Sequence, residues 1–263
     1  GVEYAALATV ISQMLSVVLC MIRLIRTQDV YQVSIRDIRF DWPLLKQIIH
    51  QGLPSGMQNS IISIANMVVQ SNINSFGKMA MAGCGAYSKI EGFGFLPITC
   101  FAMAMTTFIG QNLGAREFER VKKGARFGIL CGVGLAEMVG IGINLFIPQL
   151  IALFDRTPEV IQFGVTQAKI VTLFYFLLSF SHVIAGIMRG AGKSMVPMLV
   201  MLISWCLIRI TYVTITIHFI PDIRVVFWAY PMTWSISSII FMIYYKKADW
   251  IHYFDRQEEK QCA

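Results

Sequence analysis

The sequence is poor in charged residues. Only 14% of its 263 residues are charged, whereas a soluble domain has about a quarter, and hydrophobic residues make up 56%. The mean hydropathy is correspondingly high at +0.62. This composition excludes an ordinary water-soluble domain and indicates a protein whose solvent is the lipid bilayer.

The sequence also lacks the patterns that mark metal sites and enzymes. Its six cysteines are scattered, form no CxxC pair and have no nearby histidine at a zinc-site spacing, so they indicate neither a metal centre nor a disulfide framework. The motifs HExxH, GxSxG and GxxxxGK[ST] are missing, as is a helix with paired carboxylates. We therefore expect no enzyme, no metal, no cofactor and no ATP hydrolysis by this chain.

Long hydrophobic runs dominate what is present. A helix needs roughly 20 mostly apolar residues to cross a bilayer. Seven runs satisfy this: Tyr4–Ile22, Leu53–Phe76, Tyr87–Ile109, Phe127–Ile147, Val160–Met188, Val196–Phe219 and Val225–Tyr245. The sequence thus predicts an all-α, polytopic transmembrane helical bundle.

Basic residues alternate from one side of these runs to the other. The net charge of +7 is concentrated after the first and third runs, in the turn with Arg189 and Lys193, and after the last run at Lys246 and Lys247. The positive-inside rule places these segments, and the C-terminus with them, in the cytoplasm. Membrane topology therefore explains the basic excess, and we expect no nucleic-acid partner.

The second run carries a polar stripe. Asn59, Ser63, Asn66 and Gln70 follow a 4-3-4 spacing and share one helix face. Such amides could join helices through hydrogen bonds, or they could line a water-filled cavity. The length of the stripe over several turns favours the cavity.

Ionisable residues inside membrane spans are costly and indicate function by default. In the third run, Lys89 and Glu91 are two residues apart and cannot face each other, so Glu91 is free to attract a cation in a cavity. We add Tyr87, one turn earlier, to the predicted cavity wall.

Three more such residues lie in later runs. Glu137 and Arg209 each fall near the middle of a run and could form a buried charge pair or take part in ion coupling. His182 could be a hydrogen-bonded packing residue or a proton relay. These alternatives remain open at the level of sequence.

The fourth run has small residues at every fourth position. These are Gly124, Gly128, Gly132, Ala136 and Gly140. This spacing predicts close approach between helix backbones.

Four short strings, taken in order, carry a family resemblance. They are Gly52–Pro54, Phe95–Pro97, Gly110–Ala115 before a basic loop, and Arg189–Gly192 at the end of the fifth run. In this combination the chain resembles the multidrug and toxic compound extrusion family over nearly its whole length. The resemblance implies twelve helices in two six-helix lobes, alternating access, and antiport of protons or sodium.

The same resemblance implies a domain organisation. Residues 1–40 would form the last helix of an N-terminal lobe and a cytoplasmic crossover, 41–248 the C-terminal six-helix lobe, and 249–263 a cytoplasmic tail. The preceding lobe of the same protein would then be a partner, and the chain would belong to a longer protein. Members with a sodium site carry an acid in the tenth helix, but Leu177, Leu178 and Ser179 stand there, so that site is not expected.

Taken together, these features predict a secondary active exporter. Its substrates would be organic cations, drugs or metabolites, exchanged for protons or sodium across a bacterial inner membrane. Two alternatives are a lipid-linked sugar flippase of the same superfamily and a membrane scaffold without transport. Membrane lipid and a small molecule are the expected partners, and the coupling ion is left open.

Overall fold

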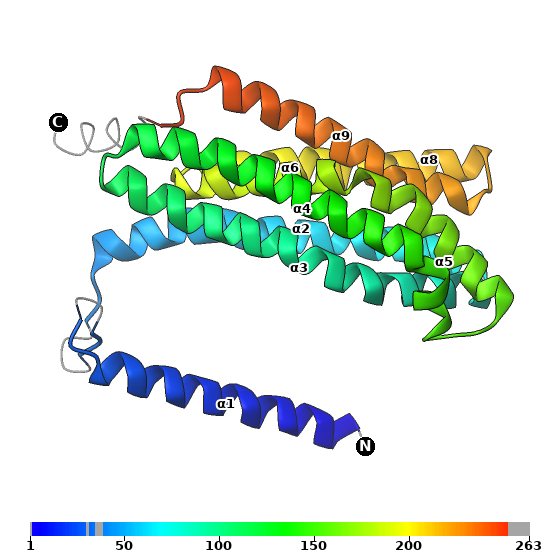
Figure 1. The fold of residues 1–263 in the computed structure, drawn as a ribbon, viewed down its shortest axis with the longest axis horizontal. Coiled ribbons are helices and arrows are strands. Elements are labelled where there is room, and N and C mark those ends of the chain that lie inside the picture. The colour runs from blue at the N-terminus through cyan, green and yellow to red at the C-terminus, as the bar shows by residue number, and fades with distance from the viewer. Residues whose placement is uncertain (1, 30–31, 35–38, 252–263) are drawn as a thin grey trace. The chain divides into compact units, whose positions relative to one another are not determined.

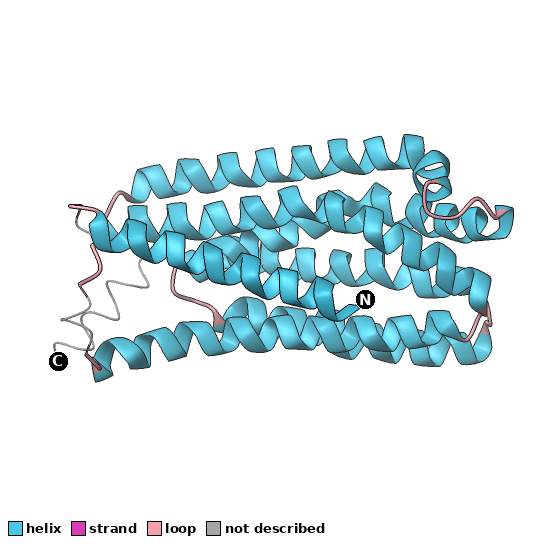
Figure 2. Ribbon diagram, turned by 90° about the horizontal axis from the view of Figure 1, so that it is seen from below, coloured by secondary structure: helices cyan, strands magenta, loops and turns pink. Residues whose placement is uncertain are grey.

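The computed structural model describes residues 2–29, 32–34 and 39–251, and the regular elements in these ranges are all helices (Figure 2). In order they are α1 (Val2–Arg26), α2 (Trp42–Asn74), α3 (Lys78–Gly114), α4 (Phe118–Ala152), α5 (Pro158–Val171), the 3₁₀ segment η2 (Thr172–Phe174), α6 (Tyr175–Gly190), α7 (Met195–Met201), the π segment η3 (Leu202–Ile208), α8 (Arg209–Phe219) and α9 (Ile223–Lys247). The chain divides into two units, residues 1–48 and 49–263. Most of the predicted tail, 252–263, lies outside the described residues.

The first unit consists mainly of α1. Its apolar side chains are exposed along the helix, as Val10, Leu15 and Val18 illustrate. Exposed apolar surface of this extent is stable in lipid or against other protein, which is what a membrane-spanning helix requires. At the end of this unit, the Asp41 carboxylate accepts a hydrogen bond of 3.1 Å from the Leu44 N–H and so caps the start of α2.

Among the described residues, six helical stretches are long and apolar enough to cross a membrane. They are Ala6–Arg26, Lys78–Gly114, Phe118–Ala152, Pro158–Gly190, Met195–Phe219 and Ile223–Lys247. Six of the seven predicted runs overlap these stretches, and the all-α, multi-pass fold is confirmed. The remaining run, Leu53–Phe76, begins in α2 and ends two residues after it, and the amides and hydroxyls of α2 lower its hydropathy.

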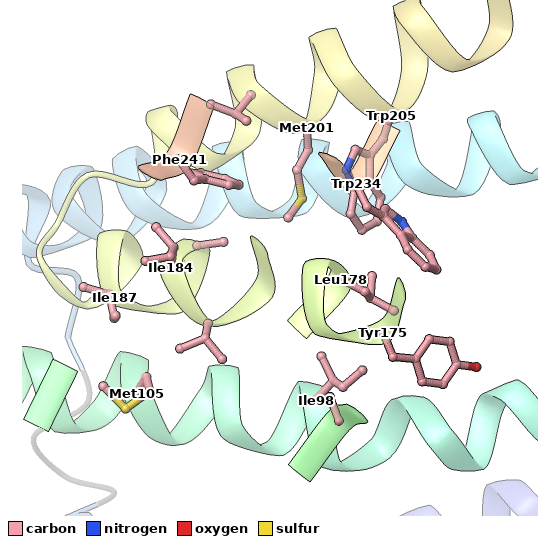
Figure 3. Packing of buried hydrophobic residues seen from close by; sticks show 14 of the residues in the cluster. Ile98, Met105, Tyr175, Leu178, Ile184, Ile187, Met201, Trp205, Trp234 and Phe241 are labelled. Atoms are coloured by element: carbon pink, nitrogen blue, oxygen red, sulfur yellow. The ribbon is translucent and has the colours of Figure 1, made fainter. Parts of the chain in front are cut away.

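The second unit is a bundle built around α3, α4 and α6. These three helices pack against one another, and α9 packs on α6 and α8 (Figure 1). Figure 3 shows the middle of the core, where Ile98, Leu178, Trp205 and Trp234 gather from four elements. Because lipid is as apolar as these side chains, close packing and hydrogen bonds stabilise this core more than exclusion of water does.

The small residues of α4 allow the close approach that their spacing predicts. The Ser179 hydroxyl donates a hydrogen bond of 2.8 Å to the Gly132 carbonyl, which joins α6 to α4. At Gly140, a Cβ atom would lie 2.6 Å from the Thr172 carbonyl oxygen. The predicted packing role of this stripe is therefore confirmed.

Two irregular segments interrupt the helices near the centre of the bundle. η2 separates α5 from α6, and η3 separates α7 from α8. Short π segments inside α-helices are frequent at functional sites, because they change the direction in which the following side chains point. Trp205 lies in η3, and Arg209 is the first residue after η3.

Candidate functional site

A cavity of about 290 Å³ lies where α2, α3, α6, η3, α8 and α9 come together. We call it the Glu91 cavity. Its polar and aromatic wall is formed by Asn66, Glu91, Trp205, Arg209, Tyr230 and Trp234. Two opposite charges thus face one cavity inside the membrane-spanning bundle.

Arg209 is the most constrained charged residue of this cavity, with only 1% of its surface exposed. Its Nη2 and Nε donate to the Thr233 hydroxyl at 2.8 and 3.3 Å, and its Nη1 donates to Asn66 Oδ1 at 3.3 Å. The guanidinium carbon also lies 4.7 Å from the ring centroid of Tyr230 and 5.3 Å from that of Trp205. Aromatic faces attract cations, so these two rings partly replace the water that Arg209 loses.

Glu91 supplies the opposite charge. It stands on α3, lines the same cavity as Arg209 and attracts it electrostatically. A carboxylate in such a place can hold the guanidinium, a proton, a metal cation or a ligand cation, and these compete for one charge. The arrangement therefore suits exchange between cations.

A second and larger cavity of about 550 Å³ adjoins the first. We call it the Arg189 cavity. Gln58, Asn59, Ser63, Thr99, His182 and Arg189 form its polar wall. Ile62, Phe95 and Trp205 line both cavities, so the two are separated by the thickness of these side chains.

Several residues predicted from the sequence lie on these walls. Asn59, Ser63 and His182 line the Arg189 cavity, and Asn66 lines the Glu91 cavity. The His182 ring stands edge-on to Phe95, with 5.0 Å between the ring centroids. The structure thus brings one part of the polar stripe together with the ionisable residues of the later helices.

Two predicted cavity residues lie elsewhere. Tyr87 is completely buried in the core, where its hydroxyl is 3.1 Å from that of Tyr175, and it lines neither of the two cavities. Gln70 donates a hydrogen bond of 2.9 Å to Asn74 Oδ1, one turn further along α2, and lines neither cavity. The stripe extends beyond the cavities because α2 continues past them.

Glu137 and Arg209 do not form the charge pair considered from the sequence. Glu137 Oε2 accepts a hydrogen bond of 3.1 Å from the backbone N–H of Phe176, in the first turn of α6. The first N–H groups of a helix have no partner within it, and the helix dipole favours an acid there. Glu137 therefore stabilises the start of α6 after the irregular η2.

The aromatic partners of Arg209 were not predicted from the sequence. Trp205 is four residues before it along the chain, but Tyr230 comes from α9. Arg189 was predicted only to lie in a basic turn, and Gln58 was not predicted to line a site. A four-residue spacing between tryptophan and arginine within one run was the available signal.

These features define a multi-pass helical membrane protein with two adjoining polar cavities. Residues 54–215, more than half of the chain, match the MatE family. The chain belongs to the MatE family, which is a family of transporters and not of enzymes.

Curated relatives agree with this assignment. YoeA of Bacillus subtilis, a probable multidrug resistance protein, is 24% identical over 250 residues, which are 94% of this chain and 54% of the relative. NorM of Thermotoga maritima, also a probable multidrug resistance protein, is 28% identical over 204 residues, with coverages of 78% and 44%. The chain spans about half the length of the curated relatives it matches.

Solved structures show the same fold. A crystal structure of MATE in complex with MaL6 matches with a TM-score of 0.84 at 21% identity, covering 92% of this chain and 55% of that one. A MOP superfamily transporter from Pyrococcus furiosus matches with a TM-score of 0.71 at 18% identity, covering 76% and 44%. Together with the family match, this shared fold confirms the resemblance inferred from the sequence.

Proposed function

We propose that the chain forms one lobe of an efflux transporter that exports small organic molecules, including cations, in exchange for protons or sodium. The relatives named as probable multidrug resistance proteins support export, and their greater length supports a second lobe in the complete transporter. The proposed location is a bacterial inner membrane, with a cytoplasmic C-terminus. No cofactor besides the coupling ion is required.

The observation that carries this proposal is the presence of Glu91 and Arg209 in one cavity of a membrane-spanning bundle. Charges in lipid are costly, and a protein retains them where they serve an ion or a substrate. An incoming proton, sodium ion or cationic substrate competes with Arg209 for the Glu91 carboxylate. Occupancy by one cation at a time is the condition that exchange transport requires.

The cavity also has a suitable place in a two-lobed transporter. In transporters built from repeats, substrate sites lie near the middle of the membrane, at the interface of the repeats, and one repeat rocks against the other. Irregular helical segments are typical of such sites, and the wall of the Glu91 cavity includes Trp205 of η3. Rocking would then expose the Glu91 cavity to each side of the membrane in turn.

The test is export of ethidium, a cationic dye, by the complete transporter in bacteria that lack their main efflux systems. Glu91→Gln keeps the size of the side chain but removes its charge, and we expect these cells to retain dye. Glu137→Gln is the matched control, because it removes a carboxylate within a membrane-spanning helix and outside both cavities. At equal amounts of protein in the membrane, the Glu137→Gln variant should export ethidium at the rate of the unmodified protein.

Export by Glu91→Gln at the rate of the unmodified protein would remove Glu91 from the mechanism. The coupling ion can be identified with purified transporter in liposomes, by imposing a proton gradient and a sodium gradient in turn. Dye movement that follows neither gradient would contradict antiport.

A further inference from the structure

The Arg189 cavity has a polarity opposite to that expected for a cation site. We propose that it binds an anionic group, a carboxylate or a phosphate, and that organic molecules bearing such a group are among the substrates of the transporter. This adds a substrate class to the proposed function, and it rests on the proposed function because both cavities must belong to the transport path.

The first observation is the charge of the wall. Among the described residues that line the Arg189 cavity, Arg189 is the charged one, and no carboxylate is present. The other polar groups are the amides Gln58 and Asn59, hydroxyl groups and His182. A cavity with one sign of charge and low-dielectric surroundings focuses its field on a ligand of the opposite sign.

The second observation is that the Arg189 guanidinium has donors to spare. A guanidinium carries about five N–H donors in a flat fork that fits a carboxylate or phosphate. Within the described part of the chain, Arg189 makes one long side-chain hydrogen bond, 3.5 Å from Nη1 to Gln58 Oε1. Most of its donors are therefore available to a ligand.

Arg209 shows what a compensated arginine looks like in the same bundle. It makes three hydrogen bonds, stacks on two rings and shares its cavity with Glu91. Arg189 has none of these partners in the described structure. The difference assigns Arg209 to internal charge compensation and leaves Arg189 for an external anion.

His182 points to the same kind of ligand. Its Nε2 atom is buried and has no hydrogen-bond partner among the described residues, although the residue lines the cavity. Unsatisfied buried polar atoms are rare and call for an explanation. A turn of the imidazole ring towards the cavity would let Nε2–H donate to an anionic oxygen held at Arg189.

The shape and lining of the cavity suit a small organic molecule. A volume of about 550 Å³ lies within the usual range of small-molecule sites, and Phe95 and Trp205 offer flat apolar surfaces beside the polar groups. Because these two side chains also line the Glu91 cavity, a ligand with both charges could place its anionic end at Arg189 and its cationic end towards Glu91.

Binding can be measured without transport. The complete transporter is purified into nanodiscs of phosphatidylcholine, and the anisotropy of carboxyfluorescein, an anionic probe, gives its affinity. Loss of charge-assisted hydrogen bonds should make Arg189→Gln bind about 10- to 100-fold more weakly. Arg189→Lys keeps the charge and should remain within a few-fold of the unmodified protein.

Lys193→Gln provides the matched control. Lys193 is a cation one turn further along the chain that lines a different cavity, with Gln51, Ser194 and Tyr244. Its replacement should leave carboxyfluorescein affinity unchanged. Unchanged binding by Arg189→Gln, or an equal loss in Lys193→Gln, would overturn the proposal.

A competition experiment with the unmodified protein avoids any defect in folding. Benzoate should displace carboxyfluorescein, whereas benzamide, which has nearly the same shape and no charge, should not. Equal displacement by both compounds would show that the cavity recognises shape and not negative charge.

The anionic group could belong to a soluble molecule or to a lipid headgroup. Replacing part of the phosphatidylcholine with phosphatidylglycerol separates the two sources. If the headgroup of an anionic lipid occupies the cavity, phosphatidylglycerol weakens probe binding in the unmodified protein but not in Arg189→Gln. If soluble molecules are the natural ligands, probe binding is the same in both membranes, and either result supports an anion site.

The binding test and the export test can fail independently. If probe binding depends on Arg189 but dye export does not depend on Glu91, only the proposed role of Glu91 is contradicted. Dye export that depends on Glu91, with no anion binding in the Arg189 cavity, would contradict the present proposal alone.

Discussion

Asn66 on α2 accepts a hydrogen bond of 3.3 Å from Nη1 of Arg209, the first residue of α8. Other amides of α2 make similar connections: Gln51 donates to the Gly192 carbonyl at 2.7 Å, and Gln58 donates to the sulfur of Met201 at 2.8 Å. Polar side chains thus attach α2 to the segment from α6 to α8. The two interpretations of the polar stripe are therefore compatible, because some amides join helices while Asn59 faces a cavity.

The attraction between Glu91 and Arg209 predicts non-additive effects on stability. Arg209→Met leaves the Glu91 carboxylate without its counter-charge and should cost about 3 kcal/mol, with a lower melting temperature in detergent. Adding Glu91→Gln should restore part of this loss, since the uncompensated charge is then gone. A double variant whose melting temperature falls by the sum of the two single effects would show that these residues do not interact.

Two glycines of α4 should respond differently to the same change. An added Cβ at Gly140 would lie 2.6 Å from a backbone carbonyl oxygen of Thr172, whereas Gly142 has open space at that position. We expect Gly140→Ala to be destabilised by about 1–3 kcal/mol through overpacking. Gly142→Ala should be neutral or stabilised by up to about 1 kcal/mol, because alanine favours helix.

Thermal unfolding of the purified protein compares the two variants directly. Equal melting temperatures for Gly140→Ala and Gly142→Ala would contradict the tight contact between α4 and η2.

A buried hydroxyl cluster predicts a further effect on stability. The Ser237 hydroxyl accepts a hydrogen bond of 3.2 Å from Trp205 Nε1 and lies 2.9 Å from the Ser181 hydroxyl. Ser237→Ala leaves the indole N–H without a partner, which should cost about 1–3 kcal/mol. Ser60→Ala is the control, because the exposed Ser60 hydroxyl donates only to the Gly56 carbonyl of its own helix.

The melting temperature should fall for Ser237→Ala and change little for Ser60→Ala. If both serines can be replaced without effect, the cluster contributes nothing to stability.

The ends of the second-unit helices predict which positions share a side of the membrane. The turn from α3 to α4 and the end of α9 lie at one end of the bundle, and the loop from α4 to α5 lies at the other (Figure 1). In a cysteine-free background, Ala115→Cys and Asp249→Cys should be protected from an impermeant thiol reagent added to intact cells. Thr157→Cys should react with it.

This pattern follows from the positive-inside rule, which places the basic turn at Arg116 in the cytoplasm. Reaction at position 115 together with protection at position 157 would reverse the orientation. Different labelling at positions 115 and 249 would contradict the helix arrangement itself.

The sequence alone determined the class of protein, its family and most of its membrane spans. Hydrophobic run length is a local property, so six runs could be located without knowing their neighbours. The glycine stripe of α4 was equally readable, because its spacing follows from the helix period. The polar stripe of α2 could also be found from the helix period, although the residues that contact it could not.

The tertiary structure decided which polar residues meet. Sequence periodicity left Glu137 as a candidate partner of Arg209, but Glu137 stabilises the start of α6, and Arg209 meets Asn66, Thr233 and the ring of Tyr230. The physical reason is that a partner depends on the rotation of each helix about its axis. η2 and η3 change that rotation within single runs, so the regular period of 3.6 residues no longer predicts the face on which later side chains lie.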